Sequence, residues 1–290
     1  MHAAREAVTT SRFLASAAQG PLLLDGAMAT CLHAMAATPG PVRACDDLSI
    51  ANPDLVRRVH EAYLDAGADI VRTNTFRAAS REHADDRVQL CVAAARLARE
   101  AADAWSLRTP HRWRFAAGAL GPADAHLSHD DARAAYRAAL RALLEGGVDV
   151  VLFETWYATA QIAPALAAYA DAAADTGRTV PMLLSLSGAS LDDDALAAVD
   201  PHVVAGVGLN CGSGPEGLSA GLAALRTHAR LVSCHPSAGL PDPSGRYPYD
   251  PDRFAHAVAA YAAAGLADIV GGCCGTTPAH VAALARAGRE

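Results

Sequence analysis

Eight short apolar runs recur along the chain, separated by Ala-rich stretches that carry arginines at helical spacing. Strands that alternate with helices in this way are typical of βα units around a parallel sheet. Eight such units in 290 residues favour a closed (β/α)8 TIM barrel, because an open doubly wound sheet usually has fewer strands. The predicted strands are Leu22–Leu24, Ile70–Thr73, Phe115–Ala117, Val148–Phe153, Met182–Leu186, Val203–Leu209, Leu231–Ser233 and Ile269–Val270.

Helix ends are marked by local signals. Asn52 before Pro53 predicts a helix start, Gly67 predicts the end of that helix, and Thr277 before Pro278 predicts another start. These signals agree with the strand pattern, so they support the βα alternation.

The domain organisation follows from the lack of any break in composition. We expect one α/β barrel over residues 21–290, preceded by a leading helix or flexible segment at 1–20. The fifth unit is expected to carry a short helix at Leu191–Val199. The Pro- and Gly-rich stretch Pro236–Pro251 is expected to form a loop over the barrel mouth, since it follows the seventh strand.

Charge and apolar run length exclude several classes of partner. A net charge of −7 offers no basic surface for nucleic acid. No apolar run reaches the roughly 20 residues that a membrane helix needs. The chain contains no lysine, so Schiff-base chemistry and a phosphate-loop lysine are also excluded. We therefore expect a small-molecule ligand.

Seven cysteines in a chain of this size are typical of a reducing cytoplasm, where cysteines are metal ligands or core residues more often than disulfides. Cys211 follows the sixth predicted strand, and Cys273 and Cys274 follow the eighth. In a barrel these positions converge at the mouth. Three thiolates with one open position describe a catalytic zinc site.

The other cysteines and the histidines allow simpler interpretations. Cys31, Cys45 and Cys91 are expected to be structural. Cys234 and His235 end the seventh strand and compete as a ligand pair, since histidine is a common zinc ligand.

Two carboxylates also stand at strand ends. Asp25 and Glu154 should face the mouth, where a substrate ammonium group would neutralise them. The alternative is that Asp25 caps a turn and Glu154 pairs with an arginine. Asn74 and Thr75 either contact substrate or satisfy loop backbone groups.

Four motifs resemble the homocysteine S-methyltransferase family. They are LDGAMAT at 24–30, TNTF at 73–76, GLNC at 208–211 and GGCCGTTPAH at 271–280. The resemblance implies a barrel in which Cys211, Cys273 and Cys274 bind Zn²⁺ and activate the thiol of homocysteine, which takes the open position and becomes methionine. It also implies that Asp25 and Glu154 hold the homocysteine amino group, while backbone amides at Gly26 and Ala27 take its carboxylate.

The methyl donor is a separate question. Residues 73–76, 118–122 and 235–241 look like the homocysteine module of cobalamin-dependent methionine synthase, although Ser237 stands where asparagine is expected. The chain ends shortly after His280, however, and stand-alone barrels of this length resemble enzymes that use S-methylmethionine or S-adenosylmethionine. We expect such a sulfonium donor, with a methyl-corrinoid on a separate protein as the alternative.

Two further expectations concern the donor and the class of function. Trp156 and Tyr157 follow Glu154 and are candidates to contact a sulfonium cation, or are ordinary loop packing. A hypothesis of another class is a zinc- or thiol-binding subunit without turnover.

Overall fold

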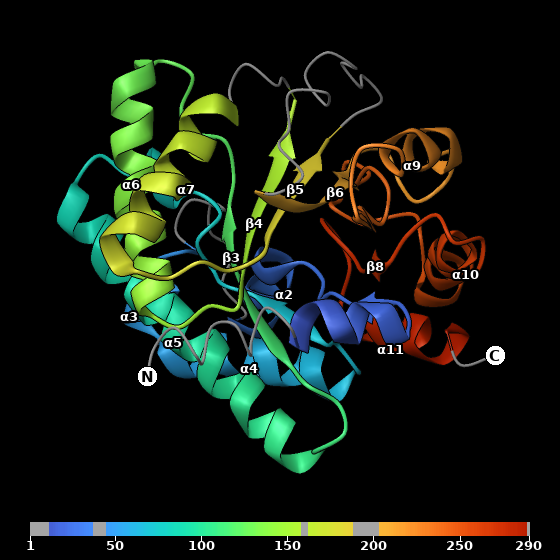
Figure 1. Cartoon of the computed structure of the whole chain (residues 1–290). Helices are drawn as coiled ribbons and strands as arrows, with labels where there is room; N and C mark the ends of the chain where they lie inside the picture. The colour runs from blue at the N-terminus through green and yellow to red at the C-terminus, as the bar shows by residue number, and fades with distance from the viewer. Residues whose placement is uncertain (1–11, 37–44, 158–161, 188–202, 289–290) are drawn as a thin grey trace.

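The computed structural model describes residues 12–36, 45–157, 162–187 and 203–288. Eight parallel strands form one sheet in the order β1-β8-β7-β6-β5-β4-β3-β2, with helices packed around it (Figure 1). A bridge between Leu24 and Ile70 joins the two ends of this order and closes the sheet. The predicted (β/α)8 barrel is confirmed.

All eight predicted strands are present. They are β1 Leu22–Leu23, β2 Ile70–Arg72, β3 Phe115–Leu120, β4 Val150–Trp156, β5 Met182–Leu186, β6 Val204–Cys211, β7 Leu231–Pro236 and β8 Ile269–Val270. Strands β3, β4, β6 and β7 continue past their predicted apolar ends. Residues beyond these ends still pair across the sheet, as Leu120 does with Phe153, Trp156 with Leu186 and Asn210 with His235.

The helices of the described ranges lie between the strands in sequence. They are α2 Met28–Ala36, α3 Leu48–Ala51, α4 Pro53–Asp65, α5 Ala84–Arg108, α6 His129–Glu145, α7 Ile162–Thr176, α9 Ser219–Leu225, α10 Pro251–Ala263 and α11 Pro278–Ala287, with a 3-10 helix η2 at Ala78–Ser80. The expected helix at Leu191–Val199 lies outside the described residues. Among the helices described, none is both long and apolar enough to cross a lipid bilayer.

The predicted helix ends are confirmed at both places. The side chain of Asn52 accepts a hydrogen bond from the amide of Leu55, and Pro53 is the first residue of α4. Thr277 begins α11 in a capping box with His280. Gly67 follows α4 with φ +107°, a conformation that glycine adopts without steric cost.

The amino-terminal end of the barrel is filled by apolar side chains. Residues 12–19 form a helix, and the fully buried ring of Phe13 packs edge-on against Phe115 of β3 at 5.2 Å. Buried side chains of β1, β2, β4, β5, β7 and β8 complete this cluster. The opposite end, where the strands finish, carries Arg72, Glu154 and Asn210.

Candidate functional site

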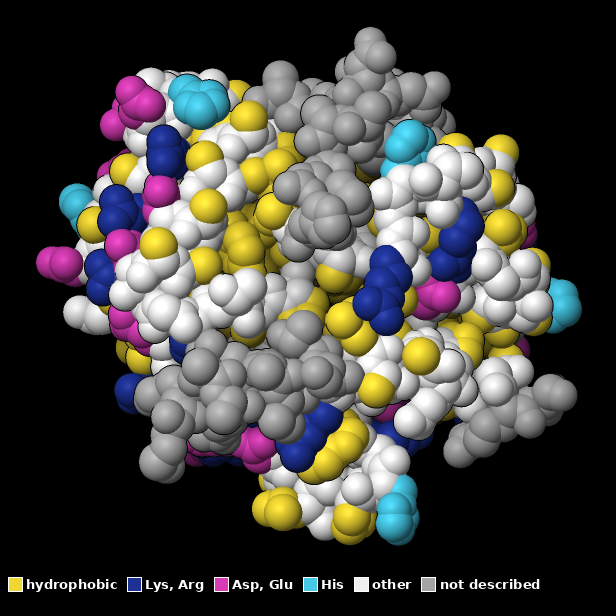
Figure 2. Space-filling model, in the orientation of Figure 1, with side chains coloured by type: hydrophobic (Ala, Val, Ile, Leu, Met, Phe, Trp, Pro, Cys, Tyr) yellow, Lys and Arg dark blue, Asp and Glu magenta, His cyan; other side chains and the backbone are white. Residues whose placement is uncertain are grey.

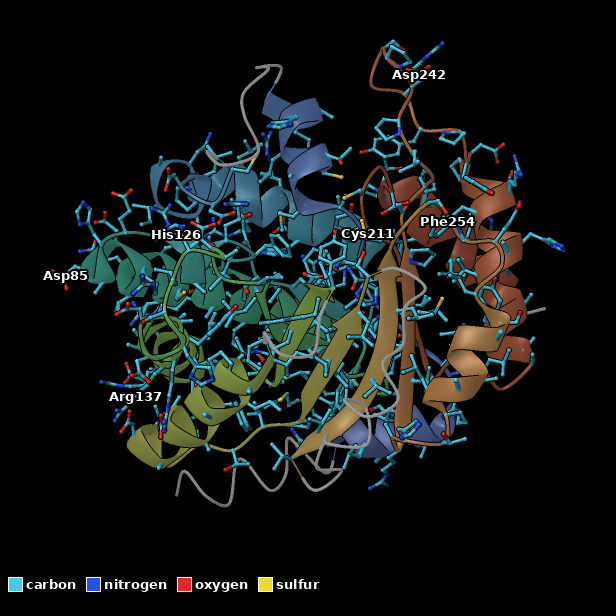
Figure 3. The ribbon with its side chains drawn as sticks, turned by 90° about the horizontal axis from the view of Figure 1, so that it is seen from above. Asp85, His126, Arg137, Cys211, Asp242 and Phe254 are labelled. Carbon is cyan, nitrogen blue, oxygen red and sulfur yellow. The ribbon has the colours of Figure 1, made fainter. Side chains whose placement is uncertain are left out.

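A pocket of about 500 Å³ lies at the carboxyl ends of the strands. Viewed from above, Cys211 lies near the centre of the molecule at the end of β6, while Asp85, Arg137 and Asp242 lie at its edge (Figure 3). The ends of β2, β4 and β6, the start of α2 and the segment after β8 line the pocket. Active sites of (β/α)8 barrels lie at this end.

The three predicted cysteine ligands come together at one side of this pocket. The sulfur atoms of Cys211, Cys273 and Cys274 all lie within 4.8 Å of one another. The Sγ atoms of Cys211 and Cys274 are 3.8 Å apart, and all three residues line the pocket. This group, called the cysteine cluster below, can hold a metal ion.

The electrostatics of the cysteine cluster favour a cation. Hydrogen bonding to Cys273 raises the pKa of Cys211 to about 11, and hydrogen bonding to Cys211 raises that of Cys274 to about 11, with burial adding to both shifts. Thiols crowded in this way stay protonated at neutral pH unless a positive charge compensates them. A soft divalent ion that prefers thiolate ligands supplies that charge, so the donor set fits zinc.

Two residues at the pocket rim have unusual backbone conformations. Thr155 has φ +67° and Cys211 has φ +59°, a region that residues with a side chain rarely adopt. Both conformations turn the chain sharply where a strand ends. Such strained positions persist when the surrounding contacts hold them in place.

Asn210 supplies those contacts. Its place in the sequence motif did not by itself predict this role. Its Oδ1 accepts hydrogen bonds from the amide of Thr155 and the hydroxyl of Ser185. Its Nδ2 donates to Thr155 Oγ1 and lies 3.9 Å from the sulfur of Cys273. Asn210 therefore ties the strained ends of β4 and β6 to the cysteine cluster. Its position directly before Cys211 was the available signal.

Asp25 and Glu154 meet beside the pocket, with the guanidinium of Arg72 between them. Arg72 Nε lies 2.7 Å from Asp25 Oδ1, and Nη1 lies 2.9 Å from Glu154 Oε2. The three side chains are almost fully buried. We call this group the arginine triad. It realises the alternative in which Glu154 pairs with an arginine, and here Asp25 pairs with the same one.

The two acids of the arginine triad have pKa values shifted in opposite directions. Burial raises the pKa of Asp25 to about 6 despite the opposing effect of Arg72. Burial acts on Glu154 in the same direction, but the charge of Arg72 and the neighbouring His235 lower its pKa to about 2. Arg72 lies within an apolar strand, and the motifs of the sequence did not assign it a role. The signal that could have found it was an arginine within an apolar run of a chain that contains no lysine.

Arg72 and Glu154 line the pocket, whereas Asp25, which is 1% exposed, lies behind them. The predicted contact of Asp25 and Glu154 with a substrate amino group stays a prediction.

His235 lies outside the cysteine cluster. Its Nε2 is 3.6 Å from Glu154 Oε2, and its ring is fully buried. Burial lowers its pKa, so the ring is neutral at neutral pH. Cys234 is also fully buried and belongs to the apolar core. The structure brings neither residue into the cysteine cluster.

The other predicted substrate contacts are engaged within the protein. Ala27 donates its amide to Thr276 Oγ1, and Asn74 donates its side-chain amide to the carbonyl of Cys45 at 2.7 Å. Thr75 donates its hydroxyl to the carbonyl of Ala119. Gly26 lines the pocket in a place without room for a side chain, since an added Cβ would lie 2.6 Å from Thr276 Oγ1.

The predicted mouth loop after β7 packs against the cysteine cluster. Ala238 donates its amide to the carbonyl of Cys274, and Ser237 donates its hydroxyl to the carbonyl of Gly212. The ring of Tyr247 lies so close to Gly275 that any side chain there would collide with it.

The two aromatic candidates for a sulfonium contact differ. Trp156 is buried between Tyr136 and Phe153 and does not line the pocket, whereas Tyr157 lines it and is 68% exposed.

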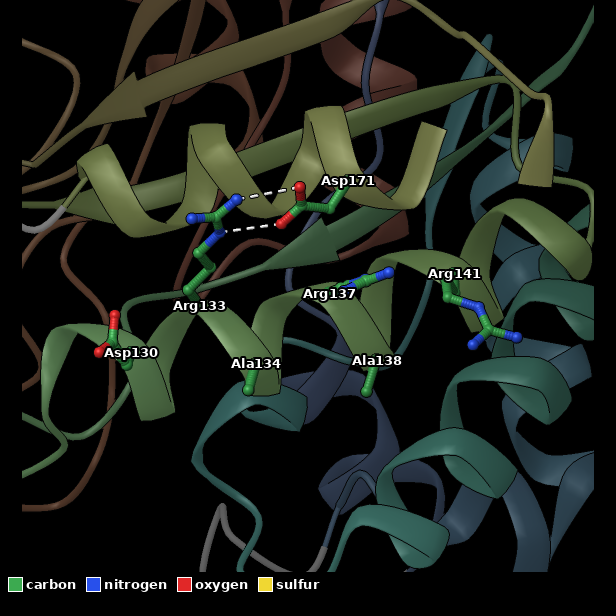
Figure 4. Close-up of a pocket in the computed structure, with 7 residues that line it drawn as sticks. All are labelled: Asp130, Arg133, Ala134, Arg137, Ala138, Arg141 and Asp171. Atoms are coloured by element: carbon green, nitrogen blue, oxygen red, sulfur yellow. Dashed lines mark hydrogen bonds and ion pairs between the residues drawn. The ribbon is translucent and has the colours of Figure 1, made fainter. Parts of the chain in front are cut away.

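A second hollow, of about 420 Å³, lies on the outside of the barrel along α6. Arg133 forms two hydrogen bonds with Asp171 of α7 there (Figure 4). Arg137 forms a similar pair with Asp175. On the face shown in Figure 2, basic and acidic side chains lie next to each other over these helices. Because these cations are paired within the protein, the hollow is a weaker candidate than the pocket at the mouth.

Known proteins resemble this chain over most of its length. Residues 22–288 match the sequence profile of the family described as homocysteine S-methyltransferase. The methionine synthases of Mycobacterium leprae and Mycobacterium tuberculosis are 35% and 36% identical over 94% and 91% of this chain. The chain spans about a quarter of the length of these curated relatives.

A solved structure is similar over almost the whole barrel. It is the metallated form of the homocysteine methyltransferase MmuM from Escherichia coli, at 27% identity and a TM-score of 0.74. The similarity covers 93% of this chain and 96% of that one.

Proposed function

We propose that this chain, which belongs to the homocysteine S-methyltransferase family, transfers a methyl group to the thiol of homocysteine and forms methionine. The observation that carries the proposal is the convergence of Cys211, Cys273 and Cys274 at the open end of the barrel. Three cysteine ligands would leave one zinc position for the acceptor sulfur. The seven cysteines are free thiols, which supports a reducing cytoplasmic location.

A bound zinc ion would lower the pKa of the acceptor thiol, so that it reacts as a thiolate at neutral pH. The residues of the pocket then have two tasks. Asn210 holds the ends of β4 and β6 and so orients Cys211 and Cys273. The pocket walls keep the sulfur and the methyl carbon within about 3.5 Å and in line.

In the transfer itself, the acceptor loses its thiol proton to solvent and its sulfur attacks the methyl carbon. The new carbon–sulfur bond forms as the bond between the methyl group and its leaving group breaks. A sulfonium donor takes the electron pair of the broken bond and leaves as a neutral thioether. We propose S-methylmethionine or S-adenosylmethionine in this role, supported by the exposed ring of Tyr157 at the pocket rim.

A methyl-corrinoid on a separate protein is the second candidate donor. It is favoured by the higher identity of the chain to methionine synthases than to the Escherichia coli structure. The chain corresponds to only a quarter of those proteins. A donor presented by another protein would then have to enter through the open mouth of the barrel.

The test is a panel of donors with homocysteine, run on zinc-loaded and chelated protein, with methionine quantified by mass spectrometry. We expect methionine from a sulfonium donor with the loaded protein and none after chelation. Transfer that survives complete zinc removal would refute the zinc site. Transfer from a methyl-corrinoid protein alone would replace the donor. Zinc and homocysteine binding without transfer from any donor would favour the non-catalytic subunit.

A further inference from the structure

The arginine triad raises a question about how the acceptor is recognised. Two carboxylates at the ends of β1 and β4 would suit an ammonium group, but the structure already places a cation between them. Arg72 reaches this place from the end of β2, where its backbone amide also donates to Asp25 Oδ2 at 2.8 Å. The cation is therefore fixed to the barrel at both its backbone and its side chain.

The guanidinium is held by more than the two acids. Nη2 donates to the carbonyls of Gly26 at 2.8 Å and Gly272 at 2.7 Å. Together with Nε on Asp25 and Nη1 on Glu154, four of its five N–H groups have partners. A group satisfied to this extent in a buried site does not swing away for a ligand without losing several charge-assisted bonds.

An ammonium group that entered the pocket would find both carboxylates already paired with Arg72. Asp25 lies behind the guanidinium and does not line the pocket. Glu154 lines the pocket but already bonds Arg72 Nη1, so an ammonium beside it would also lie next to a like charge. The remaining N–H of Nη1 belongs to a residue that lines the pocket, and it suits a carboxylate.

We propose that Arg72 takes the place of an acceptor ammonium group between Asp25 and Glu154, so that the pocket selects its acceptor by thiol and carboxylate and not by amino group. The acceptors that fit are short mercaptocarboxylates, with or without an amino group. This inference rests on the proposed thiol methylation and narrows its substrate class.

The test compares homocysteine with 4-mercaptobutanoate, which has the same thiol, chain length and carboxylate but no amino group. Binding to zinc-loaded protein is measured by isothermal titration calorimetry, so no methyl donor is needed. A pocket built to bind an ammonium would reject the analogue by roughly 10⁴-fold. We expect the two dissociation constants to agree within about tenfold. A preference for homocysteine beyond tenfold overturns the inference.

Two variants locate the effect. In Arg72→Gln the two acids lose their internal cation, so the ratio of dissociation constants should move at least about tenfold toward homocysteine. In Glu154→Gln the ratio should stay within about threefold of wild type, because Glu154 pairs with Arg72 and not with the ligand. An unchanged ratio in the first variant, or a loss of homocysteine binding alone in the second, contradicts the proposal.

The matched control is Arg114→Gln. Arg114 is also buried and ion-paired, but its partner Asp69 lies before β2, at the opposite end of the barrel from the pocket. It should leave the ratio of dissociation constants as in wild type, and a shift in this control as large as that of Arg72→Gln overturns the assignment to Arg72. If neither thiol binds the zinc-loaded protein, the proposed function fails and the inference fails with it. If homocysteine binds and is methylated but the analogue is rejected, the inference fails alone.

Discussion

The cysteine cluster and the arginine triad adjoin the same pocket, and they differ in whether their charges are paired within the protein. In the triad, the guanidinium of Arg72 already neutralises much of the charge of Asp25 and Glu154. In the cluster, three sulfurs converge at a place that can hold a metal ion. The charges of the triad are therefore paired within the protein, whereas the proposed zinc ion would complete the cluster.

The largest expected effect is on the cysteine cluster. Cys273→Ala removes one of three sulfurs, so zinc content should fall from about one per chain to near zero and methyl transfer to the level of chelated protein. Zinc is measured by elemental analysis and transfer by methionine formation. Cys91→Ala, in the buried face of α5, is the control and should keep its zinc. Full zinc content in Cys273→Ala would show that the ion is held elsewhere.

The arginine triad should matter more for stability. Arg72→Met leaves two buried carboxylates without their cation, which typically costs 3–5 kcal/mol, on the order of a third of the stability of a domain. Urea unfolding at neutral pH measures the loss. Arg133→Met breaks a surface pair with Asp171 and should cost less than about 1 kcal/mol. Equal losses in the two variants would contradict a special role for the buried triad.

The triad also predicts a pH dependence of smaller size. The folded-state pKa of Asp25 is about 6, above its ordinary value of 3.8. Its contribution to stability is therefore present below pH 3.8 and is lost as the pH rises through 6. The free energy of unfolding of wild type, relative to Asp25→Asn, should fall by about 2 kcal/mol between pH 4 and pH 7. A relative stability that rises over this range would contradict the assigned shift.

The smallest effect should come from Asn210, which ties the ends of β4 and β6 to the cysteine cluster. Asn210→Ala removes the bonds to Thr155 and Ser185 and the amide beside Cys273. Loss of such an orienting group typically weakens metal binding by about tenfold or more. Competition with a chromophoric zinc chelator measures this change. Ser187→Ala, a buried serine just beyond β5, is the comparison, and equal zinc affinity in both variants would remove the role given to Asn210.

Much of the barrel could be predicted because its signals are local. Strand runs such as Met182–Leu186 agree with the structure to the residue, since burial on both faces of a parallel strand requires continuous apolar sequence. The ends of β4 and β6 could not be placed as well. Asn210 is polar, yet it continues the sheet because His235 of β7 pairs with it, and Glu154 lies where the register between β4 and β5 shifts.

The barrel and the three cysteines that meet at its mouth could be predicted from local sequence patterns, because strand order in a barrel brings all carboxyl ends to one mouth. What lies between Asp25 and Glu154 became visible only in the folded barrel. Arg72 is separated from Asp25 by 47 positions in the sequence and from Glu154 by 82. A local sequence pattern does not predict pairing over such separations. The physical reason is that buried charges select partners by proximity in the folded barrel, where desolvation makes an unpaired charge costly.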